Sequence, residues 1–173
     1  VSGATYALDV KAYCVLSHAA FEEFFEQVSL KVMTRSIIEW QSEDEHYRIN
    51  DALLTLASYS IYKFENANEN VAPFDYLREV FGESKRRLSR NVIDNHGMSP
   101  RHLTNILLPV ALQIKQDITL QNSLLQLVKQ RGDYAHRGSI KNILSPEDAK
   151  KYVGDCLILC EDIRDKANAK FLI

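Results

Sequence analysis

The chain has 173 residues, of which 46% are hydrophobic and 25% are charged, and its formal net charge is −2. This length suits one domain with its own core, and the composition is that of an ordinary globular protein. No apolar run approaches the ~18 residues of a membrane span, and the small negative charge excludes a uniformly basic protein, so any nucleic-acid-binding surface must be a local patch.

The cysteines indicate the redox setting. There are three, Cys14, Cys156 and Cys160, and an odd, sparse count argues against a disulfide framework and predicts a reducing, cytoplasmic compartment. Cys156 and Cys160 stand four apart and could join a metal site, but free cysteines are mostly small buried hydrophobes. The chain begins at Val1 without the charged-then-apolar order of a signal peptide, so we expect a trimmed start or an internal boundary.

The first half of the chain predicts three helices separated by polar segments. A helix over about 8–40 has an apolar stripe of Val10, Cys14, Phe21, Phe24, Phe25, Val28 and Val32. A second over about 48–64 should bury Leu53, Leu54, Leu56, Ala57, Tyr59 and Ile61. A third begins near Pro73 and carries Phe74, Leu77, Val80, Phe81, Leu88, Val92 and Ile93. It should end at 95–97, where Gly97 is expected to be a left-handed C-cap.

The second half predicts a short helix and two longer ones. Ser99 and Pro100 are an N-cap and a first helical residue, before Leu103, Ile106, Leu107 and Leu108. A helix from about 120 passes Val128 into the motif RGDYAHRG at 131–138. Ser145 and Pro146 begin the last helix, which runs towards Ala169 with Val153, Leu157, Cys160 and Ile163 on one face. We therefore predict one all-α domain over 1–173, with its core at about 7–165, as a bundle of five or six helices.

The motif places Arg131 and His136 five residues apart, which in a straight helix is about 140° of rotation. Gly132 and Gly138 permit a bend or a helix end. Either the chain breaks and the two side chains converge, or they meet partners from a second copy. A histidine can move protons near neutral pH and an arginine can bind a phosphate, so the pair could cleave RNA without a metal. On spacing alone, a solvated helix tip is the better interpretation.

Charge is unevenly distributed along the chain. Residues 22–51 contain eight acids and three bases, whereas 78–101 contain six bases and three acids, and 129–141 contain four bases and one acid. We interpret the acidic stretch as solvated helix faces. The two basic stretches could meet beside the motif and attract a phosphate backbone. The predicted RNA-contacting residues are Lys129, Arg137, Arg87, Arg90, Arg101 and His102, with a solvated first turn as the alternative for the last two.

The other histidines carry weaker signals. His18 and Glu22 are four apart on the first helix and could couple, although such pairs are usually helix-surface or core-edge contacts. His96 lies at an expected helix C-terminus, where a cation is favoured anyway, and His46 lies in a polar loop. No zinc-ligand spacing and no phosphate-binding glycine loop is found. We expect no metal and no cofactor.

The sequence resembles the HEPN superfamily (higher eukaryotes and prokaryotes nucleotide-binding), and within it the RiboL-PSP type. RGDYAH matches the R-x4-H form of the superfamily motif towards the end of an all-α chain. The stretch RNVIDNHGMSPRHLTNILLPV at 90–110 is similar to that group's glycine-containing turn before a leucine-rich short helix, and ALDVKAYCVLSHAAFEEFFEQV is similar to its long first helix. The resemblance covers about residues 7–165.

This resemblance implies a symmetric homodimer and metal-independent endoribonuclease chemistry at a composite site. Arg131 would stabilise the scissile phosphate and His136 would act as general acid or base. Where many members have asparagine or aspartate directly after the arginine, this chain has Gly132. Asp133 or Tyr134 would then support the site, and Tyr134 could stack on a base; alternatively Asp133 pairs with Arg137 or Lys129.

The resemblance also implies partners beyond RNA and leaves other functions open. The superfamily occurs in toxin–antitoxin, antiviral-defence and RNA-processing systems, so an antitoxin or a larger multidomain partner is expected, and no membrane. One alternative is a non-catalytic RNA-binding or dimerisation module of the same fold. Another is a purely structural helical domain of a larger protein.

Overall fold

The structure is a computed structural model that describes residues 6–42, 49–62, 71–137 and 144–171, without the side chains of 133–137. The regular elements in these ranges are all helical, which confirms the predicted all-α class. They are α1 (Ala7–Gln41), α2 (Asp51–Tyr59), α3 (Pro73–Ile93), α4 (Pro100–Leu107), the 3-10 helix η2 (Leu108–Val110), α5 (Ile118–Arg137) and α6 (Pro146–Ala169).

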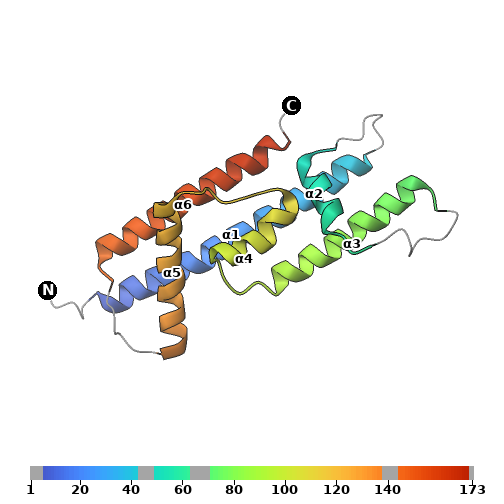
Figure 1. Cartoon of the computed structure of the whole chain (residues 1–173). Helices are drawn as coiled ribbons and strands as arrows, with labels where there is room; N and C mark the ends of the chain where they lie inside the picture. The colour runs from blue at the N-terminus through green and yellow to red at the C-terminus, as the bar shows by residue number, and fades with distance from the viewer. Residues whose placement is uncertain (1–5, 43–48, 63–70, 138–143, 172–173) are drawn as a thin grey trace.

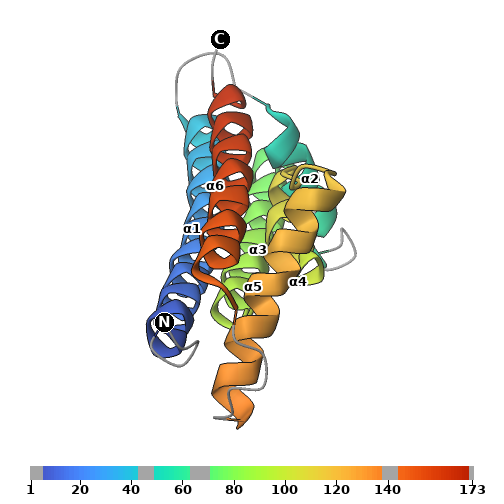
Figure 2. The ribbon, with the colours of Figure 1, turned by 90° about the vertical axis from the view of Figure 1, so that its left-hand side faces the viewer.

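Helix α1 is the axis of the molecule, because α2, α3, α4, α5 and α6 all pack against it. Figures 1 and 2 show α6 lying beside α1 in the same direction, whereas α5 crosses α1 and packs against α6. The C-terminal end of α5 projects past the other helices in both views. The segment that carries the sequence motif is therefore at the edge of the bundle.

The predicted apolar stripes form a common core. On α1, Val10, Cys14, Phe21, Phe25 and Val32 are buried, and Phe24 and Val28 pack partly buried against them. Trp40, at the other end of α1, stacks on Phe74 with ring centroids 4.8 Å apart and meets Phe81 edge-on at 4.7 Å. Aromatic contacts thus attach α3 to the C-terminal half of α1.

Several residues predicted to face inward are exposed. Helix α2 covers less than the expected 48–64, because Ile49 and Asn50 precede it and residues 60–62 follow it without helical structure. Leu54 and Ile61 face solvent, so their predicted inward placement was wrong. Leu157, predicted to share one face of the last helix with the buried Val153, Cys160 and Ile163, is exposed too. Leu77 and Ile93 of α3 and Leu108 of η2 are also exposed. Helical periodicity could not place these residues correctly, because apolar side chains occur on more than one face of each of these helices.

Small buried serines connect the helices where they cross. Ser29 Oγ of α1 donates to the Ile106 carbonyl of α4 at 2.5 Å, and Ser84 Oγ of α3 donates to the Leu56 carbonyl of α2 at 2.5 Å. Ser123 Oγ of α5 donates to Asp155 Oδ2 of α6 at 2.5 Å. Each hydroxyl lets two helices approach closely and satisfies its own hydrogen-bonding capacity inside the core.

The helix starts follow the predicted capping chemistry in part. Ser145 is the N-cap of α6, and its Oγ accepts from the backbone N–H of Asp148 at 3.0 Å. Ser99 is the N-cap of α4, but its side chain makes no cap bond.

The C-terminal end of α3 differs from the prediction. Its C-cap is Asp94, which has a right-handed conformation, and Gly97 does not adopt a left-handed φ. The prediction of a Gly97 C-cap was therefore wrong.

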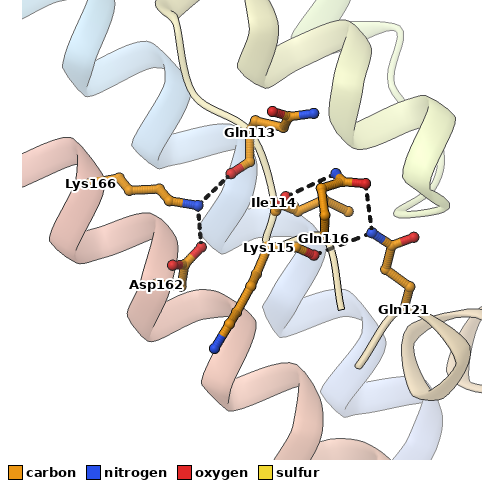
Figure 3. Close-up of polar contacts among 7 residues, drawn as sticks. All are labelled: Gln113, Ile114, Lys115, Gln116, Gln121, Asp162 and Lys166. Atoms are coloured by element: carbon orange, nitrogen blue, oxygen red, sulfur yellow. Dashed lines mark hydrogen bonds and ion pairs between the residues drawn. The ribbon is translucent and has the colours of Figure 1, made fainter. Parts of the chain in front are cut away.

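The segment between η2 and α5 is attached to α6. Ala111 turns the chain in the left-handed region at φ 52°, and residues 112–117 then run beside α6. Figure 3 shows Lys166 Nζ donating to the Gln113 carbonyl at 2.9 Å and to Asp162 Oδ2 at 2.6 Å. These bonds fix the point from which α5 starts.

Among the described helices, none combines the length and the apolar character that crossing a bilayer requires.

Candidate functional site

The site predicted from sequence lies in the last turns of α5. Asp117 precedes the helix, and its Oδ1 accepts from the backbone N–H groups of Thr119 at 2.9 Å and Leu120 at 3.1 Å. The helix then continues without a break through Gly132 to Arg137. The possibility that the chain breaks at Gly132, so that Arg131 and His136 converge within one protomer, was wrong.

The continuous helix separates the two motif positions. Leu120, Leu124 and Leu127 form the buried stripe of α5, and Arg131 follows four residues later on the same stripe. Position 136 lies about 140° away around the helix axis. Arg131 therefore lies on the side of α5 that packs inward, whereas position 136 lies on nearly the opposite side. The side chains of Asp133, Tyr134, His136 and Arg137 are outside the described part of the structure.

Arg131 is half-buried and lies near a polar pair on α1. His18 is 1% exposed, and its Nδ1 lies 3.7 Å from Glu22 Oε2 one turn later. Burial, with a smaller contribution from the Arg131 charge, lowers the pKa of His18 to about 4. His18 is therefore neutral at pH 7, and its contact with Glu22 is not an ion pair under those conditions. The contact between His18 and Glu22 is thus the core-edge contact that is usual for residues four apart on a helix.

Several charged groups affect the pKa of Glu22. Burial and the neighbouring Glu26 raise the pKa of its carboxyl group, whereas the charges of Arg131, His96 and His102 lower it. These residues come from three parts of the chain, α1, α5 and the segment 94–102 around the start of α4. We call His18, Glu22, His96, His102 and Arg131 the Arg131 cluster.

The turn between α3 and α4 forms the third side of the cluster. Asn95 Nδ2 donates to Glu26 Oε1 at 2.7 Å, which attaches the turn to α1. Ser99 Oγ lies 2.7 Å from His102 Nδ1. A Cβ at Gly97 would lie 3.2 Å from His102 Nδ1 and 3.3 Å from its Cε1. Gly97 thus leaves room for the His102 ring in its present position.

The predicted RNA-contacting residues are only partly brought together. His102 lies in the Arg131 cluster, and Arg101 precedes it as an exposed residue of α4. Arg90 and Lys129 are exposed on α3 and α5. Arg87 lies instead at the α2–α3 contact, where Nη1 donates to the Tyr59 carbonyl at 3.0 Å and the guanidinium lies 4.6 Å from the Tyr59 ring centroid.

The sequence shows the His18–Glu22 spacing but not its relation to Arg131. The spacing marks one helix face, and nothing local to α1 indicates which residue of α5 packs there. The apolar stripe of α5 contains the missing signal, because Arg131 is spaced from Leu120, Leu124 and Leu127 as a buried residue would be.

One groove of the described structure lies away from this site. It is a groove of about 780 Å³ between α1 and α6, lined by residues such as Phe24, Lys31, Ile38, Arg164 and Phe171. It includes no member of the Arg131 cluster. The chemistry at Arg131, and not a cavity, therefore defines the candidate site.

Metal ligands and reactive thiols are not apparent at the site. Within the described ranges, no three His, Cys, Asp or Glu side chains are grouped to hold a metal ion. The three cysteines are buried and free. Burial and neighbouring negative charges raise the pKa of both Cys156 and Cys160 to about 12, so these thiols are protonated at neutral pH.

Comparison with known proteins identifies a family. The family model described as RiboL-PSP-HEPN matches residues 6–169, which spans all six α-helices and the motif at 131–136. No curated protein matches the chain, and neither does any solved structure. Because the family model covers nearly the whole sequence, the chain belongs to the RiboL-PSP-HEPN family.

Proposed function

We propose that this chain is a metal-independent endoribonuclease that acts as a homodimer. The observation that carries the proposal is the R-x4-H sequence of Arg131 and His136 at the end of α5, in a chain of the RiboL-PSP-HEPN family. Two further features support it. The arginine is on the inward side of α5, where its charge acts on His18 and Glu22 of α1. The end of α5 projects from the bundle, where a second copy can approach.

The chemistry needs a base, an acid and a cation. Attack of a ribose 2′-hydroxyl on the adjacent phosphorus requires that one group removes the hydroxyl proton and another protonates the departing 5′-oxygen. His136 from each protomer would supply these two functions, and Arg131 would stabilise the charge that develops on the phosphate oxygens. The products are a 2′,3′-cyclic phosphate and a free 5′-hydroxyl, and no metal is consumed or required.

The remaining assignments are part of the same proposal. Asp133 and Tyr134 would support the two motif residues, while Lys129, Arg137, Arg90, Arg101 and His102 would contact the RNA backbone. Arg87 is the weakest of the RNA-binding predictions, because it already binds the Tyr59 carbonyl. We place the protein in the cytoplasm, in a toxin–antitoxin, antiviral-defence or RNA-processing system, with an antitoxin or a larger multidomain partner.

Cleavage in EDTA tests the proposal. The wild type should cut RNA to 2′,3′-cyclic phosphate ends, and Arg131→Ala and His136→Ala should each lose at least about 100-fold in rate. Arg164→Ala is the matched control, because Arg164 is an exposed arginine of α6 outside the Arg131 cluster. An intact His136→Ala activity would refute the catalytic assignment.

Dilution tests the composite site. If two protomers form it, cleavage per chain should fall as the protein is diluted below the dissociation constant of the dimer. Sedimentation at the same concentrations should show the corresponding monomers. A specific activity that is constant while the dimer dissociates would contradict a shared site.

A non-catalytic RNA-binding or protein-interaction module is the second candidate. Gly132 favours it, because no polar side chain directly follows Arg131 to orient the motif. In that case the wild type binds RNA without cutting it, and Arg131→Ala weakens binding. The same cleavage assay, run beside a binding assay, distinguishes the two candidates.

A further inference from the structure

The groove between α1 and α6 has no role in the proposed mechanism. Its lining comes from residues 24–38 of α1, from Arg164, Ala167 and Asn168 of α6, and from Phe171 just after that helix. Figures 1 and 2 show these two helices running side by side. No other described helix contributes a lining residue. The described part of the chain therefore leaves this face of the helix pair uncovered.

The floor of the groove is apolar. Phe24, Val28 and Leu30 of α1 pack only partly buried against the core. Phe171 does the same from the α6 side, and Ile38 is 60% exposed. Apolar side chains that are gathered on one surface, with polar residues around them, mark an interaction site, whereas single exposed ones do not. An occupant with an apolar face would be stabilised by covering this floor.

The rim of the groove is cationic. Lys31, Arg35 and Arg164 line it, and none of the described lining residues is acidic. Lys31 is exposed and has no ion pair within the described ranges. The two arginines use Nε to bind Glu39 at 2.8 Å and Asp165 at 3.0 Å. Such exposed pairs are weak, and each guanidinium has further N–H donors for another carboxylate. In a chain of net charge −2, this rim is a local excess of positive charge.

The length of the groove suits a helix. Phe24 and Ile38 are separated by about 21 Å along α1, at a rise of about 1.5 Å per residue. A partner helix of about 14 residues has the same length. A helix that packs against two others places its apolar stripe between them and its flanking residues beside both. Recognition of an amphipathic helix by an apolar groove is a recurring mode of protein binding.

We propose that the α1–α6 groove binds an acidic amphipathic helix of another protein. The apolar stripe of that helix covers Phe24 and Ile38. Its glutamates or aspartates, on either side of the stripe, pair with Lys31, Arg35 and Arg164. A lysine-rich helix is rejected, because like charges at an interface are costly. The inference goes beyond the proposed ribonuclease function and does not depend on it, since the groove shares no residue with the Arg131 cluster.

Peptide binding to the whole chain tests the inference. Two labelled peptides of about 14 residues, each held helical by a side-chain staple, have leucines on one face. The remaining positions are glutamate in one peptide and lysine in the other. Fluorescence anisotropy should show the glutamate peptide binding at least about tenfold more tightly, and its affinity should fall as salt screens the rim charges. Equal affinities, or no binding of the glutamate peptide, would overturn the inference.

Charge reversal tests whether the peptide binds at this rim. Lys31→Glu should weaken binding of the glutamate peptide at least about tenfold and strengthen binding of the lysine peptide. Lys85→Glu is the matched control, because Lys85 is an exposed lysine of α3, and it should change neither affinity by more than about twofold. Equal losses in the two variants would place the binding elsewhere and end the proposal.

A polar substitution in the floor tests the apolar contact. Because Ile38 is 60% exposed, Ile38→Asp should leave the chain folded, which circular dichroism checks, and abolish binding of the glutamate peptide. Ile93, which is 76% exposed on α3, provides the control variant Ile93→Asp, with binding retained. Retained binding in a folded Ile38→Asp variant would show that the floor is not used.

A second copy of this chain is the alternative occupant of the groove. Sedimentation of the wild type, Ile38→Asp and Ile93→Asp distinguishes the two occupants. If only Ile38→Asp converts a wild-type dimer into monomers, the groove is a contact between copies and the inference of an acidic helix fails. If Ile38→Asp leaves the oligomeric state unchanged and loses the peptide, the inference is supported.

Discussion

At the scale of single residues, burial decides which of the predicted polar groups acquire unusual properties. His18 and His102 have the same side chain, but His18 is 1% exposed and neutral at pH 7, whereas His102 is exposed on the first turn of α4. The difference arises because desolvation disfavours the charged form of a buried imidazole. The sequence contains no local mark of that difference.

The low pKa of His18 predicts a pH dependence of stability. Its folded pKa of about 4 lies below the 6.5 of an unperturbed histidine, so the unfolded chain binds the proton more readily. The unfolding free energy should therefore fall by about 3 kcal/mol as the pH drops from 6.5 to 4. His18→Gln should remove this contribution, whereas His102→Gln should retain it, as measured by urea unfolding at each pH.

The comparison with His18→Gln is needed because Glu22 acts in the opposite direction. Its raised pKa means that the folded chain takes up that proton first as the pH falls, which favours folding. Identical pH profiles for the wild type and His18→Gln would refute the prediction.

Gly97 predicts a local effect on His102. A Cβ would approach His102 Nδ1 to 3.2 Å, so Gly97→Ala should displace the ring and break its contact with Ser99. The 15N shift of His102 Nδ1 should move towards its value in Ser99→Ala. Because His102 is exposed, the unfolding free energy should change by less than about 1 kcal/mol. An unmoved Nδ1 signal would contradict the role given to Gly97.

At the scale of elements, the sequence left open whether α5 continues through its glycine. The glycine at 132 indicated a possible bend, but the helix continues because Leu120, Leu124 and Leu127 anchor it on α1 and α6 and its backbone bonds extend to Arg137. The packing of the first turns of α5 stabilises the helix enough for it to continue through Gly132, a residue that disfavours helix. The separation of positions 131 and 136 follows directly from that continuity.

Gly132→Ala should stabilise α5. No atom lies within 4 Å of the position that a Cβ would take, and the residue does not have a left-handed φ. Alanine is favoured over glycine in a helix interior by about 1 kcal/mol, so the unfolding free energy should rise by about that amount. Thermal unfolding measures it, and Gly154→Ala in α6, also unobstructed, is the matched comparison. A destabilised Gly132→Ala would indicate that the helix bends at this point.

At the scale of the whole molecule, the other α-helices all pack against one long helix, α1. Polar residues of α1, of α5 and of the turn before α4 meet only because each of these elements packs on the N-terminal half of α1. The hydrogen bond from Lys166 to the Gln113 carbonyl attaches the segment before α5 to α6. The candidate site is thus a consequence of how the bundle is assembled.

The unfolding free energy should depend on whether a substitution truncates a buried or an exposed side chain of α5. Leu127 is fully buried, whereas Leu125, two residues earlier, is 43% exposed. Leu127→Ala should lower the unfolding free energy by about 2–5 kcal/mol through lost burial and a cavity. Leu125→Ala should cost less than about 1 kcal/mol. Equal losses in denaturant unfolding would show that α5 does not pack on the bundle as described.

The sequence by itself determined the all-α class, the order and approximate bounds of the helices, and the R-x4-H motif that the family model also covers. These features are local: the spacing of apolar residues, caps such as Ser145, and a short run of residues. Only the tertiary structure decided that α5 is continuous, that Gly97 accommodates His102, and that His18 and Glu22 lie beside Arg131. The physical reason is that burial and charge depend on neighbours distant in sequence, and helical periodicity specifies an inward face without specifying what it meets.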